Sequence, residues 1–309
     1  MNILAGNIWY FPFEIDFIIW LQNLGAGTFF QTFLQAINNF FSLLGEETIM
    51  IAIMGVVFWG LDKERGKRIG GTLIVATVVN PLIKNAVKRL RPWQSTDKIT
   101  LQREVGGYSF PSGHSSSSAT IYSTLAYEYK DKNYKWLTAI CIALPLLVAF
   151  SRNYLGAHFI TDVVCGLLLG YGIFIGMEWA LRRISNPYIL YYGILIISLI
   201  GFFYCDSHDF YNSYGLLLGF TTGTQFEDKF VKFKNTKVWW KVLLRTAVGG
   251  VIYLGLNELI KLIFKGVFVE DSTADLIFRT LRYALNVFIL VGVYPLVFKP
   301  FDKLIKNEN

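Results

Sequence analysis

Three ionisable side chains border a long apolar run in the middle of the chain. Arg152, His158 and Asp162 lie where one apolar run, residues 136–150, gives way to the next, residues 159–181. Ionisable groups at the edge of a membrane segment are costly and usually serve a function. His158 and Asp162 are four residues apart, so on a helix they share one face and can touch. A carboxylate beside an imidazole fixes its tautomer and makes the other ring nitrogen a better base or nucleophile. The alternative is that these are ordinary polar residues at the mouth of a membrane helix.

A second stretch with two cations precedes this one. Lys84 and Arg91 are seven residues apart, about two helical turns, so they lie on one helix face. Pro92 disfavours a helical conformation at Arg91 and predicts that the helix ends there. A lysine and an arginine at one helix end suit a multiply charged oxyanion, because arginine offers a planar fork and lysine a point charge. The intervening Lys88 and Arg89 are interpreted as interfacial anchors.

A third stretch opens another apolar helix. Pro111 followed by Ser112 and Gly113 is a helix start signal. Gly113 lets the backbone approach a ligand, the free amides of a helix start attract anions, and Ser112 adds a hydroxyl donor. His114 is placed to give a proton to a leaving oxygen. The alternative is a capped helix without chemistry, and the serine run 115–118 is interpreted as helix packing.

The elements that must position these residues are membrane helices. Of 309 residues, 53% are hydrophobic, and apolar runs of bilayer-spanning length recur along the chain. We therefore predict an all-α, polytopic membrane protein rather than a soluble domain. The net charge of +7 does not indicate nucleic-acid binding, because much of the lysine and arginine lies in short loops. The three cysteines show neither a disulfide framework nor metal spacing, and no Asp/His cluster of metal-ligand type is visible.

We predict ten membrane spans after an interfacial helix. Residues 9–24 hold aromatics and isoleucines around Glu14 and Asp16, a pattern typical of an amphipathic helix at a membrane surface. The predicted spans are residues 27–44, 47–61, 69–88, 113–129, 136–151, 158–181, 187–204, 211–225, 242–264 and 276–298.

The loop charges predict how these spans are oriented. Basic residues are concentrated in alternate loops, at 63–68, 130–135, 182–183, 229–237 and 299–306, whereas the loops 45–47, 205–209 and 265–271 are acidic or nearly neutral. Because cytoplasmic loops are enriched in Lys and Arg, both termini are placed in the cytoplasm and the three stretches outside. The loop 89–112 is basic although it lies outside, which a bound anion would explain. The lack of glycosylation acceptors favours a bacterial plasma membrane.

Small residues and one charge pair give further expectations about packing. Two Gly-x-x-x-Gly patterns in the sixth span would let another helix approach it closely. In the later spans Glu258 and Lys261, three residues apart, can pair on one helix face. The glycines of the two patterns are Gly166, Gly170, Gly172 and Gly176.

Taken in order, the three stretches resemble the signature of the type 2 phosphatidic acid phosphatase superfamily. The matching pattern is Lys84-x6-Arg91-Pro92, then Pro111-Ser112-Gly113-His114, then Ser151-Arg152-x5-His158-x3-Asp162. That group includes lipid phosphate phosphatases, prenyl-diphosphate phosphatases, glucose-phosphate phosphatases and vanadium haloperoxidases. The resemblance covers residues 27–182, a six-span core. It leaves 1–26 as an N-terminal interfacial segment and 183–309 as an additional C-terminal transmembrane region of unknown role.

The resemblance implies a role for each matching residue. His158 would be the nucleophile that forms a phosphohistidine, Asp162 would orient it, and His114 would protonate the leaving alkoxide and then activate water. The residues implied to hold the phosphate oxygens are Lys84, Arg91, Ser112, Gly113 and Arg152. Phosphoryl transfer depends mainly on positioning and charge neutralisation, which three cations can supply. We therefore expect no metal and no other cofactor.

The expected substrate is a lipid that carries phosphate. Candidates are phosphatidic acid, phosphatidylglycerol phosphate, a prenyl diphosphate and a sphingoid-base phosphate. Gly45-Glu46-Glu47, Trp59 and Asp62-Lys63 loosely resemble the branch that contains sphingosine-phosphate phosphatases. Two alternatives remain: a haloperoxidase, against which the membrane spans argue, and a flippase-like protein that only binds or transports lipid phosphate. The expected partners are the lipid substrate and the bilayer, with no nucleic acid, and the sequence leaves the oligomeric state undetermined.

Overall fold

Helices account for all the regular structure in the part of the chain that is described. The computed structural model describes residues 7–300, and within them an isolated bridge between Asn7 and Arg89 is the only extended pairing. The chain divides into two compact units that interleave along the sequence. The first unit comprises residues 1–50, 79–179 and 201–207, and the second comprises residues 51–78, 180–200 and 208–309. The predicted division into three consecutive domains stays a prediction.

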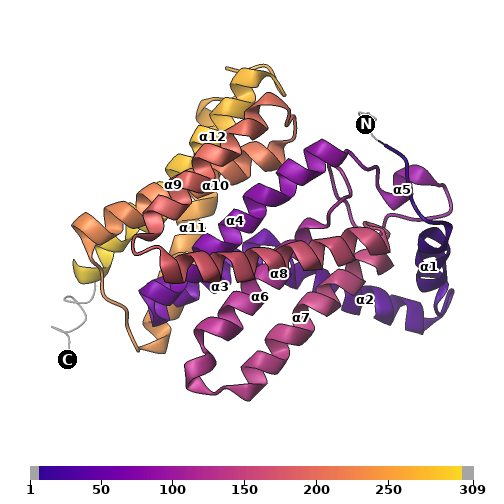
Figure 1. Cartoon of the computed structure of the whole chain (residues 1–309), viewed down its shortest axis with the longest axis horizontal. Helices are drawn as coiled ribbons and strands as arrows, with labels where there is room; N and C mark the ends of the chain where they lie inside the picture. The colour runs from indigo at the N-terminus through magenta and orange to yellow at the C-terminus, as the bar shows by residue number, and fades with distance from the viewer. Residues whose placement is uncertain (1–6, 301–309) are drawn as a thin grey trace. The chain divides into compact units, whose positions relative to one another are not determined.

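The first unit contains all three stretches singled out above. In it α6 packs on α7, and α7 packs on α2 and on α1 (Figure 1). Its helices are α1 (Pro12–Asn23), α2 (Phe29–Leu44), the end of α4 (Lys63–Val87) from Val79 onward, α5 (Pro92–Ser95), α6 (Gly113–Glu128), α7 (Lys135–Tyr154) and most of α8 (Ile160–Arg183). The short 3-10 helix Lys130–Lys132 lies between α6 and α7.

Glycines allow α8 to lie directly against α6. A Cβ atom at Gly166 would lie 2.6 Å from the carbonyl oxygen of Ser112, and one at Gly170 would lie 2.3 Å from that of Ser116. The predicted close helix approach is therefore confirmed for the first Gly-x-x-x-Gly pattern. Of the second pattern, Gly172 and Gly176 face open space, with no described atom within 4 Å of an added Cβ.

The helices α2 and α3 (Glu47–Gly55) do not form the predicted pair of antiparallel spans. Helix α3 continues into the π-helical Val56–Leu61. Taken together, α2 and this longer helix are apolar enough to cross a membrane, and their axes are bent by 52° at the break between them. Two spans joined by a tight turn need a near reversal of direction, and a 52° bend is far from that. This pair therefore forms a broken span or a re-entrant loop.

Helix α1 lies against the loops that carry the three stretches. Its Gln22 side chain donates to the carbonyl oxygens of Thr100 (2.8 Å) and Tyr154 (3.2 Å), and it accepts from the Thr100 amide (3.1 Å). Gly156, at φ 69°, makes room for this contact, because a Cβ there would lie 2.9 Å from Gln22 Nε2. The prediction that the N-terminal helix and these loops lie on opposite sides of the membrane is therefore wrong.

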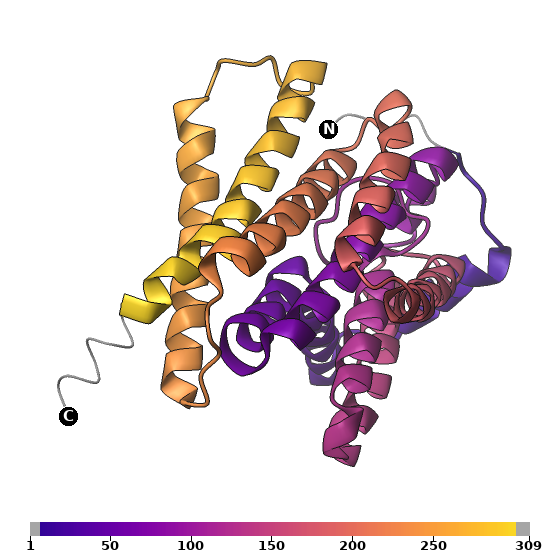
Figure 2. The ribbon, with the colours of Figure 1, turned by 60° about the vertical axis from the view of Figure 1, so that its left-hand side comes forward.

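The second unit contains the later helices. Here α10 packs on α12, and α11 packs on the segment Val56–Leu61 (Figure 2). Its helices are the second part of α3, α4 up to Val78, α9 (Pro187–Ser198), α10 (His208–Phe226) with the π-helical Glu227–Val231, α11 (Trp239–Ile263), and α12 (Thr273–Phe288) with its continuation to Val297. The predicted pair of Glu258 and Lys261 is confirmed, with 2.6 Å between Oε1 and Nζ.

A buried acidic residue ties together the basic start of α4 and the end of α10 within this unit. Glu227 is fully buried, and its Oε1 accepts from Lys63 Nζ at 3.0 Å. Lys67 pairs with Asp228, which also accepts from the hydroxyl of Tyr188. A pocket of about 280 Å³ beside this network is lined by polar and charged side chains, among them Lys67, Tyr188 and Asp228, together with apolar ones. Lys67 pairs there with Glu64 and with Asp228, so we assign the pocket no ligand.

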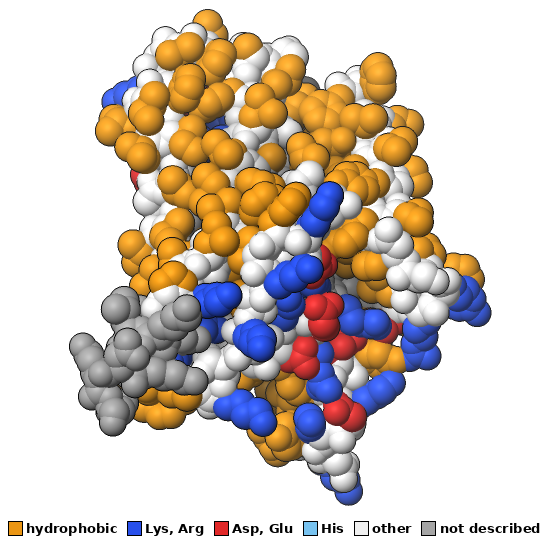
Figure 3. All heavy atoms as spheres, turned by 90° about the vertical axis from the view of Figure 1, so that its left-hand side faces the viewer, with side chains coloured by type: hydrophobic (Ala, Val, Ile, Leu, Met, Phe, Trp, Pro, Cys, Tyr) orange, Lys and Arg blue, Asp and Glu red, His pale blue; other side chains and the backbone are white. Residues whose placement is uncertain are grey.

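Several helices can cross a membrane. By length and composition, five described helices qualify, or six if the bent pair of α2 and α3 counts as one span. All ten predicted spans are helical, but the shorter α9 and the polar α6 and α10 do not meet these criteria. Large apolar side chains of α11 such as Val251 and Leu262 are exposed. Figure 3 shows apolar side chains over most of one face and charged side chains gathered at one end of it, as expected of a membrane protein.

Candidate active site

The structure brings the three stretches together within the first unit. Lys84 lies in the last turn of α4 and Arg91 four residues beyond its end, whereas Ser112 caps the start of α6. Arg152 lies in the last turn of α7, and the loop that follows leads to Asp162 in the first turn of α8. One backbone hydrogen bond, from the Ser112 amide to the Asp162 carbonyl (2.9 Å), joins the second stretch to the third.

His158 is held in a buried loop between α7 and α8. Its backbone carbonyl accepts from Asn153 Nδ2 at 2.9 Å, and the side chain is 2% exposed. Its Nε2 lies 3.1 Å from Nη1 of Arg91. Because a guanidinium can only donate, Nε2 is the unprotonated nitrogen and Nδ1 carries the proton. Burial and then the charges of Arg91, Arg152 and Lys84 lower the pKa of His158 well below 6.5, which keeps the ring neutral.

The predicted contact between His158 and Asp162 is present, but a third side chain shares it. His158 Nδ1 lies 3.5 Å from Asp162 Oδ2 and 3.3 Å from the hydroxyl oxygen of Ser109. Ser109 in turn donates to Asp162 Oδ2 at 2.5 Å, and the Phe159 amide donates to the same oxygen at 2.7 Å. The helix begins only at Ile160, so Asp162 also ties the His158 loop to the helix start. Sequence reasoning missed Ser109, whose position in an irregular loop carries no periodic signal.

Arg91 and Arg152 differ in how many of their N–H donors already have a hydrogen-bond partner. Arg91 donates to three backbone carbonyls, those of Gly106 (2.5 Å), Gly107 (2.9 Å) and Ala157 (2.9 Å). Arg152 is 1% exposed, and its Nη1 donates to the hydroxyl of Ser42 at 2.5 Å. Its Nε and Nη2 are buried and have no hydrogen-bond partner among the described residues. A buried charged donor without a partner is costly, so this guanidinium indicates a place for an anion.

The second stretch is fixed to α4 through a side chain that the sequence reasoning did not select. Asn80 Nδ2 donates to the carbonyl of Pro111 (3.3 Å) and to the hydroxyl of Ser116 (3.1 Å). A Cβ atom at Gly113 would lie 3.8 Å from the ammonium nitrogen of Lys84, so the cation lies beside this backbone. Asn80 is one turn before Lys84, and that spacing is the signal that could have identified it.

His114 lies beside the break between α2 and α3. A Cβ atom at Gly45 would lie 3.2 Å from Cδ2 of His114 and 2.5 Å from Cγ1 of Val148. The position therefore admits no side chain without displacing one of these neighbours. The half-buried His114 imidazole thus packs against backbone on one side.

Arg89 is not the interfacial anchor that the sequence analysis predicts. Its side chain is fully buried, and its Nη1 donates to Asp162 Oδ1 at 2.6 Å. Lys88 differs: its φ is 52°, its side chain is 36% exposed, and it pairs with Asp206 at 3.2 Å. The sharp turn at Lys88 is what directs Arg89 inward, and composition alone cannot reveal such a turn.

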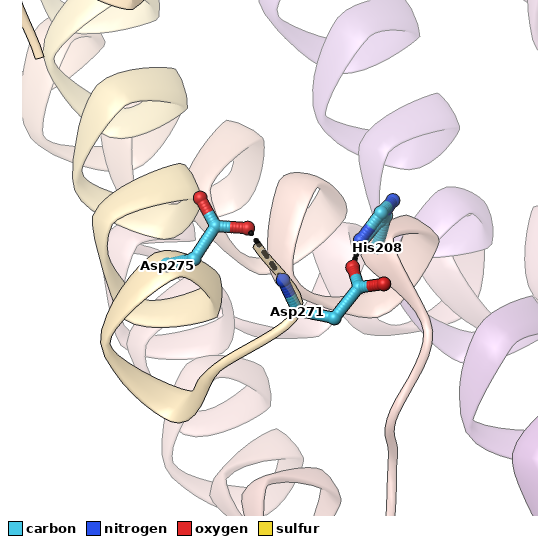
Figure 4. Close-up of side chains that lie close together, drawn as sticks. All are labelled: His208, Asp271 and Asp275. Carbon is cyan, nitrogen blue, oxygen red and sulfur yellow. Dashed lines mark hydrogen bonds and ion pairs between the residues drawn. The ribbon is translucent and has the colours of Figure 1, made fainter. Parts of the chain in front are cut away.

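A separate group of possible metal ligands occurs in the second unit, contrary to the expectation that no Asp/His cluster forms. His208, Asp271 and Asp275 place one ligand atom each within 4.8 Å of one another (Figure 4). His208 Nε2 lies 2.5 Å from Asp271 Oδ1, and Asp275 accepts from Arg279 Nε at 2.9 Å. His208 and Asp275 are half-buried and Asp271 is exposed, and each of the three already has a hydrogen-bond or ion-pair partner, so we assign them no metal.

Comparisons with known proteins identify the family of the segment that contains the three stretches. Residues 66–185 match the PAP2 superfamily, and residues 211–306 match the transmembrane extension of PAP2 superfamily phosphatases. The chain is 30% identical over 155 residues to phosphatidylglycerophosphatase B of Bacillus subtilis, covering 47% of this chain and 73% of the relative. It is 32% identical over 142 residues to an undecaprenyl-diphosphatase of Sulfolobus acidocaldarius, covering 44% and 66%. A solved structure, the first transmembrane PAP2 type phosphatidylglycerolphosphate phosphatase from Bacillus subtilis, aligns with a TM-score of 0.47 and 24% identity over 57% of this chain and 89% of that one.

The second match corrects the extent of the resemblance. Three of the four later predicted spans, 211–225, 242–264 and 276–298, fall inside the matched extension, so this region is also a family feature. The apolar helices and the extension together make the chain a multi-pass membrane protein. With both segments matched and a relative at 30% identity, the chain is a phosphatase that belongs to the PAP2 superfamily.

Proposed function

We propose that this protein is an integral membrane phosphatase that hydrolyses the phosphomonoester or diphosphate of a lipid through a phosphohistidine at His158. One observation supports this most directly. Arg152 buries two guanidinium donors, Nε and Nη2, that have no partner among the described residues. Its backbone carbonyl accepts from the amides of Ala157 and His158, so the same short segment holds the cation and the nucleophile. A phosphate oxygen would complete the hydrogen bonds of this guanidinium.

In the first step, the phosphate binds among the cations and His158 attacks phosphorus. Arg91 now donates to the lone pair of Nε2, and a phosphate oxygen placed there would take over that donor and leave Nε2 facing phosphorus. Arg152, Lys84 and the start of α6 at Ser112 and Gly113 would neutralise the remaining oxygens. The bond from phosphorus to the lipid oxygen breaks, and that oxygen takes a proton from His114.

In the second step, water releases the phosphate. His114, now unprotonated, takes a proton from a water molecule whose oxygen attacks the phosphorus of the phosphohistidine. The P–N bond breaks, its electron pair returns to Nε2 of His158, and phosphate leaves. Nδ1 of His158 would donate to the hydroxyl of Ser109, which donates to Asp162 Oδ2. The Asp162 carboxylate, 3.5 Å from Nδ1, would stabilise the cationic ring of the intermediate. The cations supply the charge neutralisation, so we propose that neither a metal nor another cofactor is required.

The proposed substrates are lipids because the protein is itself embedded in a membrane. The two relatives described above carry names that refer to phosphatidylglycerophosphate and undecaprenyl diphosphate. We therefore propose this class for the chain and include phosphatidic acid and sphingoid-base phosphates within it. The loop charges support an active site on the extracytoplasmic face of a bacterial plasma membrane.

Phosphate release by the purified protein tests the proposal. The full-length chain in detergent is given phosphatidic acid, phosphatidylglycerol phosphate, a prenyl diphosphate and a sphingoid-base phosphate in turn. His158→Ala should abolish turnover because the covalent pathway is lost, and His114→Ala should lower it about 10²- to 10⁴-fold. His208→Ala, which alters a histidine of the second unit, is the matched control and should leave turnover unchanged.

Two results would contradict the proposal. Near-native turnover by His158→Ala would remove the phosphohistidine. Tight binding of a lipid phosphate by the wild-type protein without release of phosphate from any member of the panel would make this a lipid-phosphate binding or transport protein.

A further inference from the structure

A chain of buried charges extends from Asp162 away from His158. The guanidinium of Arg89 donates from Nη1 to Asp162 Oδ1 and to the hydroxyl of Thr161, both at 2.6 Å, and from Nη2 to Glu14 Oε2 at 3.0 Å. Its Nε donates to the carbonyl of Trp9 at 3.0 Å. The side chains of Arg89, Glu14 and Asp162 are all fully buried.

Aromatic rings hold the guanidinium in place. The centroid of the Trp9 ring lies 3.9 Å from Cζ of Arg89, and that of Phe159 lies 4.1 Å from it. A planar cation between two π faces, with donors directed at two carboxylates, has little freedom to turn. The position of Oδ1 of Asp162 is thereby fixed, just as Ser109 and the Phe159 amide fix Oδ2.

Glu14 comes from α1, which lies outside the segment that matches the superfamily. Its Oε1 accepts from the amide of Thr161 (2.8 Å) and from its hydroxyl (2.7 Å), and its Oε2 also accepts from the Phe11 amide (3.0 Å). The carboxylate therefore contacts both Arg89 and the residue next to Asp162. A carboxylate at zero exposure is costly unless its oxygens are hydrogen-bonded and a cation lies beside it, and both conditions hold for Glu14.

The charge count explains what Glu14 adds. Arg89 alone would neutralise Asp162 and leave little negative charge beside His158. With Glu14 also bound to Arg89, the three groups carry a net charge of −1, since one guanidinium faces two carboxylates. In a buried setting this charge strongly favours a cation nearby.

We infer that Glu14 and Arg89 are positioning residues for phosphoryl transfer, which act through Asp162 to stabilise the cationic phosphohistidine. The inference rests on the proposed function. When the P–N bond forms at Nε2, the P–O bond to the lipid breaks, and the leaving oxygen takes a proton from His114. The imidazole ring of His158 keeps its proton on Nδ1 and becomes positively charged. Because Glu14 also pairs with Arg89, the charge of Asp162 is not fully neutralised and can stabilise the cationic ring. Glu14 lies on α1, so phosphorylation of His158 depends on α1 being packed in this position.

Single-turnover kinetics of full-length variants separate this role from a purely structural one. We compare Glu14→Gln with Asp16→Asn, which removes the same charge from an exposed position two residues along α1. Glu14→Gln should slow phosphoenzyme formation about tenfold or more, which corresponds to about 1.4 kcal/mol, with KM changed less than about twofold. Hydrolysis of the phosphoenzyme should not slow, because a less stabilised cation is the better leaving group. Asp16→Asn should behave like the wild type, and Glu14→Asp, which keeps the charge, should recover most of the lost rate.

The amplitude of the phosphoenzyme signal distinguishes the outcomes. If Glu14→Gln lowers only the amplitude and leaves the rate constant unchanged, the residue merely anchors α1 and the inference is overturned. An equal slowing by Asp16→Asn would overturn it as well. If Glu14→Gln cannot be purified in folded form, Arg89→Lys is measured by the same criteria. Lysine keeps the charge but lacks the fork that joins Glu14 to Asp162, so the rate constant of phosphoenzyme formation should again fall. Failure of the wild-type protein to form a phosphohistidine would instead contradict the proposed function.

Discussion

Replacing Arg152 by methionine should have opposite effects on two quantities: it should not lower the stability of the protein without ligand, but it should weaken phosphate binding. In the unliganded protein, Arg152 buries Nε and Nη2 without partners among the described residues, and each such charged donor costs about 1–3 kcal/mol. Arg152→Met removes both and fills a similar volume, but it loses the hydrogen bond to Ser42, which contributes about 1.5–3 kcal/mol. Removing the two donors gains about 2–6 kcal/mol in total, and losing the hydrogen bond costs about 1.5–3 kcal/mol, so the free energy of unfolding without ligand should change by about −1 to +4.5 kcal/mol, centred on about +2. The expected variant is more stable than the wild type by about 2 kcal/mol.

The same substitution should strongly weaken binding of a phosphate-like anion. If Nε and Nη2 each form a charge-assisted hydrogen bond to the anion, their loss amounts to about 3–6 kcal/mol, or about 10²- to 10⁴-fold in affinity and in kcat/KM. Thermal unfolding in detergent, with and without vanadate, measures both effects. Wild-type Tm should rise with vanadate, whereas the Tm of Arg152→Met should be as high or higher without vanadate and should not respond to it.

Lys132→Met is the matched control, because Lys132 is an exposed cation of the same unit. It should change neither the unliganded Tm nor the response to vanadate. A variant Arg152→Met that unfolds more readily without ligand, yet keeps the wild-type response to vanadate, would refute the reasoning. Arg152 would then be a structural cation rather than part of a phosphate pocket.

Two further predictions concern cofactors and topology. Turnover of the lipid substrate should persist in excess chelator and should be inhibited by vanadate, since cations of the chain supply the charge neutralisation; a strict Mg²⁺ requirement in a phosphate-release assay would contradict this. The topology test uses single cysteines in a background without the three native ones. Cysteines near Gly27 and Thr96 should both react with an impermeant thiol reagent added to intact cells, because α1 contacts the loop that contains Thr100. A cysteine near Lys234 should react only after the membrane is opened. Opposite labelling of Gly27 and Thr96 would show that the two are not on one face.

The convergence of the three stretches could be predicted from the sequence because each motif lies at a helix end. Pro92 and Ser112 mark where helices end and begin, and the observed α4 and α6 have these limits within a few residues. Asp162 beside His158 follows from their spacing, although the helix begins two residues after His158. Such local signals depend on neighbours in the chain, so they survive without any knowledge of the tertiary structure.

The parts that could not be predicted depend on distant pairs or on angles. Glu14 and Arg89 are 75 residues apart, and the one local contact of Glu14 that is described above, with the Phe11 amide, does not mark it as buried. The 52° bend between α2 and α3 was equally inaccessible, because hydropathy records where an apolar run is interrupted and not whether the chain turns back. The side of the membrane predicted for α1 depended on counting α2 and α3 as two separate spans, so that prediction was wrong as well.

The positions of Ser42 and Glu14 restrict which fragments of this enzyme can keep the active site intact. The segment that matches the superfamily, residues 66–185, omits α1 and α2 and includes pieces of both compact units. A fragment cut at those limits would leave Arg152 without its hydroxyl partner, Arg89 with one carboxylate instead of two, and the loop at Thr100 without Gln22. The boundaries of the family match therefore differ from those of a fragment that could carry out catalysis by itself. Excision, domain grafting or a split-protein design on this scaffold has to retain the chain from α1 onward.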